Sequence, residues 1–342
     1  MRASVMRAHG GPDVLRPEEL PDPVAAPGQV RVRVRACALN HLDLWTRRGL
    51  PGRTIAFPHV LGNDIAGEID DLPAPIEGLS VGQRVMLSPG TSCGRCAMCL
   101  SGEDNSCRHY RIFGYQIPGG YAERVVSPAA NVIPIPDHVD FAHAAAFPLV
   151  FLTAWRMLVT RAQVRPGDDV LVWAAGSGVG MAAVQIAKAR GARVIATAGG
   201  AAKLDRAREL GADEVIDHYA ADVPAEIRRL TGKKGVEVVI EHVGEATWER
   251  SIACLAHRGR LVTCGATTGP LGKTELRYLF SKQLSLLGSY MGSKAELLEV
   301  APLLFAGKLR TVVHEVLPLG EARRAHEIME ASQHFGKIVL AP

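Results

Sequence analysis

A glycine-rich turn, Ala174-Ala-Gly-Ser-Gly-Val-Gly180, separates an apolar stretch at residues 169–175 from an amphipathic stretch at residues 179–190. The first stretch is predicted to be a buried strand, and the second a helix that ends before Gly191. Glycines allow the backbone to turn sharply and to approach a pyrophosphate, whose negative charge then meets the helix N-terminus. A plain tight turn is the alternative, but the flanking strand and helix supply the context that a dinucleotide-binding motif requires.

The chain after residue 150 alternates between strand-like and helix-like segments. Strands are predicted at residues 193–197, 236–240 and 260–264, and a helix at residues 204–210 before Gly211. Repeated β-α-β units of this length imply a parallel sheet that helices cover on both faces. This part of the chain is therefore predicted to belong to the α/β class.

The first 140 residues are rich in Pro, Gly and short alternations of valine. Residues 30–35, Val-Arg-Val-Arg-Val-Arg, alternate with a period of two and predict a half-buried strand. Residues 81–87 and 123–126 are further strand candidates, and turn sequences such as Pro21-Asp-Pro lie between strands. These features predict an all-β, barrel-like domain that carries one long loop.

Four cysteines stand close together in that loop: Cys93, Cys96, Cys99 and Cys107. Four thiolates suit a structural Zn²⁺, and an all-cysteine shell leaves no open position for a substrate. Disulfides are one alternative, but the N-terminus has no apolar signal-peptide core, so a reducing compartment is expected. An iron–sulfur cluster is another, but its fourth cysteine would follow after about three residues, and the gap here is longer. We expect one structural zinc ion per chain.

The end of the strand at residues 193–197 indicates which nucleotide binds. NAD-binding units usually carry Asp or Glu there to hold the ribose 2′-hydroxyl. This chain has Ala198-Gly199-Gly200 instead, with Lys203 and Arg206 just beyond. The missing acid leaves room for a 2′-phosphate, which nearby cations would favour, so NADP(H) is the predicted cofactor. The alternative is that Lys203 and Arg206 form the solvated face of a helix.

Length and charge exclude several classes of protein. A chain of 342 residues is long enough for about two domains, and its net charge of +4 is spread without a basic block. Neither a nucleic-acid partner nor a membrane partner is therefore expected. The longest apolar run, residues 144–155, is too short to span a bilayer. Cys37, Cys254 and Cys264 are interpreted as core residues, and the prediction is a cytoplasmic globular protein.

Taken together, these motifs resemble those of the medium-chain dehydrogenase/reductase superfamily, which includes zinc-type alcohol dehydrogenases and quinone oxidoreductases. The cysteine lobe, the glycines at 62 and 67, Gly119-Gly-Tyr-Ala-Glu123, the nucleotide loop and Gly336-Lys-Ile-Val-Leu340 fall in the family's order. The resemblance covers essentially the whole chain.

The resemblance also implies a domain organisation and a set of cofactor contacts. A GroES-like β-barrel catalytic domain would occupy residues 1–150, with the zinc lobe at about 90–110, and an inserted Rossmann domain would occupy residues 151–288. Residues 289–342 would complete the catalytic domain. NADP(H) would contact Thr153, Ala175, Gly176, Ser177, Gly178, Val179, Gly180, Ala198, Gly199, Lys203 and Gly265.

The ligands of a catalytic zinc ion are missing from the positions where the family carries them. Zinc-dependent members have cysteine where this chain has Asn40, histidine where it has Asn63, and a third ligand near Leu149. Asparagine is a poor ligand for a borderline-soft ion. The comparison therefore implies a structural zinc without a catalytic one.

The pattern Asn40-x-x-Asp43 resembles the quinone-oxidoreductase branch, which lacks the catalytic zinc and uses NADPH. A rearranged metal site of His41, Asp43 and Asp64 is an alternative, although it needs an unusual ligand set. Otherwise Asp43 and Asp64 would satisfy backbone groups or arginine side chains, and His41 would line the cleft or pack.

Without a catalytic zinc, hydrogen-bond donors must stabilise the charge that develops on the substrate. Hydride addition to an enone gives an enolate, over which the charge is spread, and a quinone accepts hydride readily for a similar reason, whereas a simple ketone becomes an alkoxide. We therefore predict NADPH-dependent hydride transfer to an enone or a quinone. Asn40, His41 and Asp43 are the candidate catalytic residues, with Asn40 or His41 at the carbonyl oxygen. The alternative for Asn40 is a turn residue without a catalytic role.

Two other functions are alternatives: an alcohol/ketone dehydrogenase, with or without an unrecognised metal, and an NADPH-holding scaffold or sensor without turnover. A metal-dependent dehydrogenase would contain about two zinc ions per chain instead of one. In the family, strands like those within residues 261–290 extend the sheet across a dimer interface, so a homodimer is predicted.

Overall fold

The computed structural model describes residues 1–342, which divide into two compact units. The first unit contains residues 1–149 and 293–342, and the second contains residues 150–292. None of the helices is both long enough and apolar enough to cross a bilayer. The chain therefore builds most of one unit, then the whole of the other, and returns to finish the first.

The first unit is built mainly from β-sheets. Its strands are β1 (Arg2–Met6), β2 (Arg16–Glu19), β3 (Gln29–Ala38), β4 (His59–Val60), β5 (Asp64–Asp71), β6 (Arg84–Leu87), β7 (Gly90–Thr91), β8 (Arg111–Ile112), β9 (Arg124–Pro128), β10 (Val132–Pro134), β17 (Val313–Pro318) and β18 (Lys337–Ala341). Its helices are α1 (His41–Arg48), α2 (Ala97–Leu100), α3 (Phe141–Ala145), α10 (Lys294–Phe305) and α11 (Ala322–Glu330), with short 3₁₀ turns at Pro12–Val14, Asp104–Ser106, Ala129–Asn131 and Leu319–Glu321. The largest sheet has the order β10-β6-β5-β3-β18-β17, and β9 also pairs with β3.

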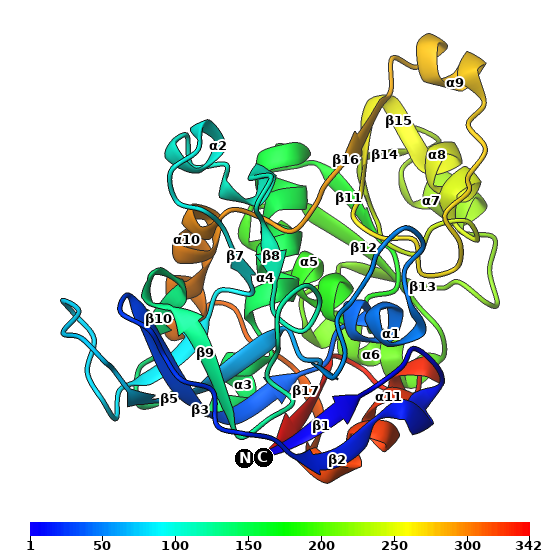
Figure 1. Ribbon diagram of the computed structural model, residues 1–342. Coiled ribbons are helices and arrows are strands. Elements are labelled where there is room, and N and C mark those ends of the chain that lie inside the picture. Colours follow the sequence, from blue (N-terminus) through cyan, green and yellow to red (C-terminus); the bar gives the residue numbers. More distant parts are fainter. The chain divides into compact units, whose positions relative to one another are not determined.

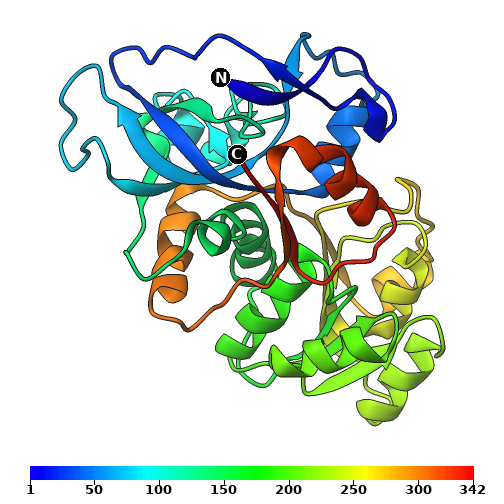
Figure 2. The same ribbon diagram turned by 90° about the horizontal axis from the view of Figure 1, so that it is seen from below.

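Strand β3 lies at the centre of this sheet and shows the predicted alternation. Val30, Val32 and Val34 are buried, while Arg33 and Arg35 are exposed. Strand β18 pairs with the end of β3, so that Leu340 lies opposite Cys37. Figure 2 shows this C-terminal strand, in red, beside the blue strands of the N-terminal segment. The C-terminal segment therefore completes a sheet that the N-terminal segment begins.

The second unit is an α/β structure. Its elements in chain order are α4 (Pro148–Trp155), a π-helical segment (Arg156–Arg161), β11 (Asp169–Val172), α5 (Gly178–Ala189), β12 (Arg193–Ala198), α6 (Ala201–Glu209), β13 (Glu214–Asp217), α7 (Val223–Leu230), β14 (Val236–Glu241), α8 (Trp248–Cys254), β15 (Leu255–Thr263), α9 (Leu276–Ser281) and β16 (Ser285–Gly288). All strand pairs are parallel, in the order β13-β12-β11-β14-β15-β16. Helices α5 and α6 pack near β11–β13, and α7 and α8 pack against each other beside β14 and β15 (Figure 1). The predicted parallel sheet is confirmed.

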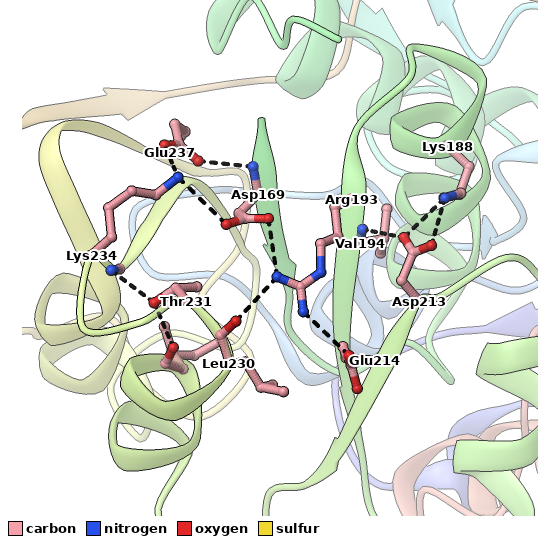
Figure 3. Close-up of polar contacts among 12 residues, drawn as sticks. Asp169, Lys188, Arg193, Val194, Asp213, Glu214, Leu230, Thr231, Lys234 and Glu237 are labelled. Carbon is pink, nitrogen blue, oxygen red and sulfur yellow. Dashed lines mark hydrogen bonds and ion pairs between the residues drawn. The ribbon is translucent and has the colours of Figure 1, made fainter. Parts of the chain in front are cut away.

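Ion pairs join the amino ends of these parallel strands (Figure 3). Arg193 lies 3.6 Å from Asp169 and 3.2 Å from Glu214, so it links the first residues of three neighbouring strands. Lys234 lies 2.8 Å from Glu237 and 3.6 Å from Asp169. Because most of these groups are partly exposed, each pair contributes little stability by itself. In open parallel sheets, ligands bind at the opposite, carboxyl ends of the strands.

Several element ends differ from the sequence-based prediction. Helix α5 ends at Ala189, and Gly191 follows with a φ of 78°, a conformation that glycine adopts easily. Helix α6 begins at Ala201, earlier than the predicted residue 204, because Gly200 at φ 84° turns the chain directly into it. Strand β15 begins at Leu255 instead of residue 260, and its pairing with β14 contains an irregularity. Such local irregularities leave no periodic signal in the sequence.

Candidate functional site

The four clustered cysteines lie together in the lobe around α2. Their ligand atoms all lie within 4.8 Å of one another. The Sγ–Sγ distance is 3.6 Å between Cys96 and Cys99, 3.6 Å between Cys93 and Cys107, and 3.9 Å between Cys93 and Cys99. Tetrahedral Zn–S bonds of about 2.3 Å place sulfur atoms about 3.8 Å apart. The cluster therefore fits the structural zinc ion that the spacing predicted.

Backbone groups favour the thiolate form of one of these cysteines, Cys93. Hydrogen bonds from the backbone N–H groups of Arg95 and Cys96 lower the pKa of Cys93 to about 6. Thiolates are the form of cysteine that binds metal. The lobe is also fastened to α10, because the backbone N–H of Lys294 donates to Asp104 at 2.8 Å.

The glycine turn after β11 has the geometry of a phosphate-binding loop. Ser177 is the N-cap of α5, and its Oγ accepts the backbone N–H of Gly180 at 2.9 Å. A Cβ atom at Gly180 would lie 2.3 Å from the carbonyl oxygen of Ala174. The Ala175 N–H donates to Thr197 O in β12 at 2.8 Å, which ties the turn to the neighbouring strand. The turn and the N-terminus of α5 suit a pyrophosphate.

A carboxylate of the neighbouring strand β13 lies beside the end of β12, and the sequence analysis did not anticipate it. Parallel pairing places Asp217 of β13 opposite Ala198. The Asp217 carboxylate accepts the N–H groups of Gly200 at 3.1 Å and Tyr219 at 2.9 Å. These bonds lower the pKa of Asp217, with the Tyr219 N–H as the largest cause. The strand register is the signal that could have revealed this acid.

The other predicted cofactor residues lie at separate points of the second unit. Lys203 is in the first turn of α6, and burial lowers its pKa. Thr153 is buried in α4, and its hydroxyl has no hydrogen-bond partner. Gly265 follows β15 and lines a pocket of about 400 Å³ together with Cys264 and Ser289, whose buried hydroxyl is also unpartnered. Unpartnered buried hydroxyls suit polar groups of a ligand.

Asn40 and Asp43 are held rigidly at the start of α1. Asp43 is fully buried, and its two carboxylate oxygens accept the backbone N–H groups of Asn40 at 2.8 Å and Gly62 at 2.9 Å. Burial raises the pKa of Asp43 to about 7, although the two N–H donors favour its charged form. Asp43 thus satisfies backbone groups, the role expected for it in the absence of a rearranged metal site.

Asp64 joins Asn40 to a lysine that the sequence analysis overlooked. Its Oδ2 accepts the Asn40 Nδ2 at 2.9 Å and the Lys337 Nζ at 3.0 Å, and its Oδ1 accepts the Leu149 N–H at 2.8 Å. Lys337 also donates to the Asn40 Oδ1 at 2.6 Å. The cation beside Asp64 is therefore a lysine, not the expected arginine. We call Asn40, Asp64 and Lys337 the buried triad.

Comparisons with known proteins agree with this geometry. Residues 26–137 match the alcohol dehydrogenase GroES-like domain, and residues 178–306 match the zinc-binding dehydrogenase family. A quinone oxidoreductase from Pseudomonas aeruginosa is 33% identical over 98% of this chain and 98% of its own length. The chain belongs to the medium-chain dehydrogenase/reductase superfamily. It is accordingly an oxidoreductase with a GroES-like domain and a Rossmann-like domain.

Two further relatives illustrate the range of the superfamily. A 2-haloacrylate reductase from a Burkholderia species is 32% identical over 99% of this chain and 98% of its own length. The crystal structure of an NAD-dependent alcohol dehydrogenase is 50% identical and superposes with a TM-score of 0.97, with all of both chains covered. Membership in the superfamily therefore does not decide the substrate or the nucleotide.

The three residues at the expected positions of the catalytic zinc ligands bond to other protein groups. Asn40 belongs to the buried triad, and Leu149 contributes only its backbone N–H to Asp64. Asn63 is fully buried, donates through Nδ2 to the carbonyl oxygen of Phe113, and has an unpartnered Oδ1. His41 lies beside Trp45, with ring centroids 6.2 Å apart. The only group of three or more metal-ligating side chains close enough to share an ion is the cysteine cluster.

A second buried network in this superfamily member fixes the protonation of His326. The guanidinium of Arg47 donates to His326 Nδ1 at 3.0 Å, so the proton of the neutral ring is on Nε2, 3.1 Å from the Tyr121 hydroxyl. Burial, followed by Arg47 and Arg48, lowers the pKa of His326 to about 3. Glu330, one turn after His326 in α11, pairs with the same guanidinium.

Acid is expected to weaken the fold through this histidine. In the unfolded chain His326 binds a proton as the pH falls below about 6.5, whereas in the folded chain it binds one only near pH 3. The cost of keeping the folded ring neutral is therefore absent only well above pH 6.5, and it grows by about 2 kcal/mol between pH 7 and pH 5. Urea unfolding of wild type and His326→Gln at both values measures this. The wild type should lose about 2 kcal/mol more than the variant, and equal losses would contradict the assignment.

Proposed function

We propose that this protein transfers hydride from NADPH to an α,β-unsaturated carbonyl compound or a quinone without a catalytic zinc ion. The buried triad carries this proposal. Two of the positions where zinc-dependent relatives carry ligands, 40 and 149, are here bonded to Asp64, and Asp64 is bonded to Lys337. Because the amide, carboxylate and ammonium groups of the buried triad are already hydrogen-bonded to one another, they favour a reaction that needs no metal ion at this place.

The substrate class follows from the weakness of the available donors. NADPH, when bound, supplies a hydride. The Asn40 amide can stabilise charge on a carbonyl oxygen by a few kcal/mol, on the order of 3 for one well-placed donor. Stabilisation of this size is better matched to an enolate, whose charge is delocalised, than to an alkoxide, whose charge is localised on one oxygen. His41, which is half-buried at the start of α1, is the candidate for supplying the proton.

The nucleotide preference rests on the end of β12. Ala198 and Gly199 stand where an acid would hold a ribose 2′-hydroxyl, and Lys203 and Arg206 follow in α6. Asp217 lies nearby, but its two oxygens already accept backbone N–H groups. The 50% identical relative is described as NAD-dependent, which supports the opposite preference. Comparing the binding of NADPH with that of NADH therefore tests the proposed preference for NADP(H).

Lys203→Ala is expected to weaken NADPH binding about tenfold and to change NADH binding less than about twofold, because only NADPH offers a 2′-phosphate to the ammonium. Fluorescence titration of the purified protein with each nucleotide measures this. Arg190→Ala, which removes an exposed cation at the end of α5, is the matched control and should leave both affinities unchanged. Equal weakening of both nucleotides would contradict a 2′-phosphate contact.

The reaction itself is tested by assaying the protein with NADPH against a panel of enones, quinones, aldehydes and alcohols. The proposal expects reduction of enones or quinones to exceed turnover of simple alcohols. The alternative of alcohol dehydrogenation has a specific observation in its favour, the name of the 50% identical structure. Alcohol oxidation that a chelator abolishes would establish that alternative. Tight NADPH binding without any turnover would instead indicate a scaffold or sensor.

We further propose a homodimer that pairs through the edge strand β16. This strand ends the parallel sheet, so its outer backbone groups lack a neighbouring strand. The chain just before and just after it exposes large apolar side chains, namely Leu271, Leu276, Tyr278, Phe280 and Tyr290. Light scattering should give a mass of twice the 36.6 kDa chain, and a monomer at micromolar concentration would contradict the proposal.

A further inference from the structure

The lysine of the buried triad is unusually secluded. Lys337 is the first residue of β18, its side chain is 2% exposed, and Asp64 beside it is fully buried. Burying an ammonium group costs free energy unless an opposite charge and hydrogen bonds compensate. Asp64 supplies the opposite charge. The second partner of Lys337, however, is a neutral side chain, the carboxamide of Asn40.

The two charged groups allow only one orientation of the Asn40 carboxamide. An ammonium group can only donate, and a carboxylate can only accept. Lys337 Nζ therefore faces Asn40 Oδ1 at 2.6 Å, and Asp64 Oδ2 faces Asn40 Nδ2 at 2.9 Å. Rotating the amide by 180° would place its NH2 group against the ammonium of Lys337, donor against donor, and its oxygen against the carboxylate of Asp64, acceptor against acceptor.

This orientation leaves one donor of Asn40 uncommitted. The Nδ2 group carries two hydrogens, and Asp64 accepts one of them. The Asn40 backbone N–H is already donated to Asp43. The second Nδ2 hydrogen is thus the group through which Asn40 can bind a carbonyl oxygen, and its direction is set before a substrate arrives.

We propose that Lys337 is a positioning residue, which locks the Asn40 carboxamide so that its second N–H is aimed at the carbonyl oxygen of the substrate. The inference rests on the proposed function, because it needs a substrate carbonyl at Asn40. Preorganised donors stabilise developing charge because they need no reorganisation during the reaction. Without Lys337, the Oδ1 end of the amide loses its strongest partner and the donor loses its fixed direction.

A purely structural lysine, which only neutralises Asp64, makes a different prediction. Its removal would weaken the fold and would affect turnover to the same extent whether or not Asn40 is present. A positioning residue acts through Asn40, so its effect disappears once the Asn40 side chain is removed. A double-mutant cycle on kcat separates the two roles.

The experiment measures kcat and KM for the best enone or quinone, and the NADPH Kd, in wild type, Asn40→Ala, Lys337→Met and the double variant. Asn40→Ala should lower kcat by about 10- to 100-fold. Lys337→Met should lower kcat by a similar factor, and the double variant should lie within about twofold of Asn40→Ala. The NADPH Kd should stay within about twofold throughout. Lys308→Met, which removes an exposed lysine from the same unit, is the control and should match the wild type.

Two results would overturn the inference while the proposed function stands: an active Lys337→Met with kcat within twofold of wild type, or losses that multiply in the double variant. A wild type that reduces no enone or quinone would overturn the proposed function and the inference together. Lys337→Met leaves Asp64 without its cation. If it does not fold, Asp64→Asn with Lys337→Met removes both charges, and the cycle then compares wild type, Asn40→Ala, this charge-free pair and the triple variant.

Discussion

Asp64→Ala is expected to lower the free energy of unfolding by about 3–5 kcal/mol, because it leaves a buried ammonium group without its counter-charge. Lys337 is 2% exposed, so water cannot replace the lost counter-charge in the folded structure. The same substitution removes the acceptor of Asn40 Nδ2 and of the Leu149 N–H. Urea unfolding at pH 7 measures the loss.

Two controls accompany this measurement. Asp205→Ala breaks an exposed ion pair with Arg208 and should cost less than about 0.5 kcal/mol. Adding Lys337→Met to Asp64→Ala removes the stranded charge and should restore a large part of the lost stability. An Asp64→Ala protein within 1 kcal/mol of wild type would show that the buried triad is not held together as described.

Gly180→Val is expected to weaken nucleotide binding by at least about 100-fold. A Cβ atom at this position would lie 2.3 Å from Ala174 O and 2.9 Å from Ala175 Cα. These are backbone atoms, so the turn itself must open, and its N–H groups would leave the positions from which they bind a pyrophosphate. Fluorescence titration with NADPH measures the change.

The matched control for this substitution is Gly320→Ala. A Cβ atom there meets nothing within 4 Å. It should bind NADPH as the wild type does. If Gly180→Val also bound within about threefold of wild type, residues 174–180 would be an ordinary turn, as the alternative interpretation of the sequence holds.

Features formed by residues that are close together in the sequence could be predicted from the sequence. The valine alternation of β3, the glycine turn before α5 and the four cysteines each lie within a short stretch of chain. Local periodicity and ligand spacing are sufficient to identify such features. The parallel character of the sheet and the clustering of the four cysteines were therefore predicted, although several element ends were not.

Features that depend on distant residues could not be predicted in this way. Lys337 meets Asn40 across 297 positions of sequence. Asp217 reaches the end of β12 only because β13 pairs with it in a particular register. The sequence motif Gly336-Lys-Ile-Val-Leu340 indicated the family but not that its lysine would be buried against Asn40. Side-chain partners of this kind follow from the packing of whole strands, which no short pattern encodes.

The zinc content of the active protein tests the absence of a catalytic metal most directly. Elemental analysis of purified protein that reduces an enone with NADPH, combined with anomalous diffraction, gives both the number and the position of the ions. We predict one zinc ion per chain, bound by Cys93, Cys96, Cys99 and Cys107. A second zinc ion at Asn40, Asn63 or Asp64, whose removal stops turnover, would contradict the account.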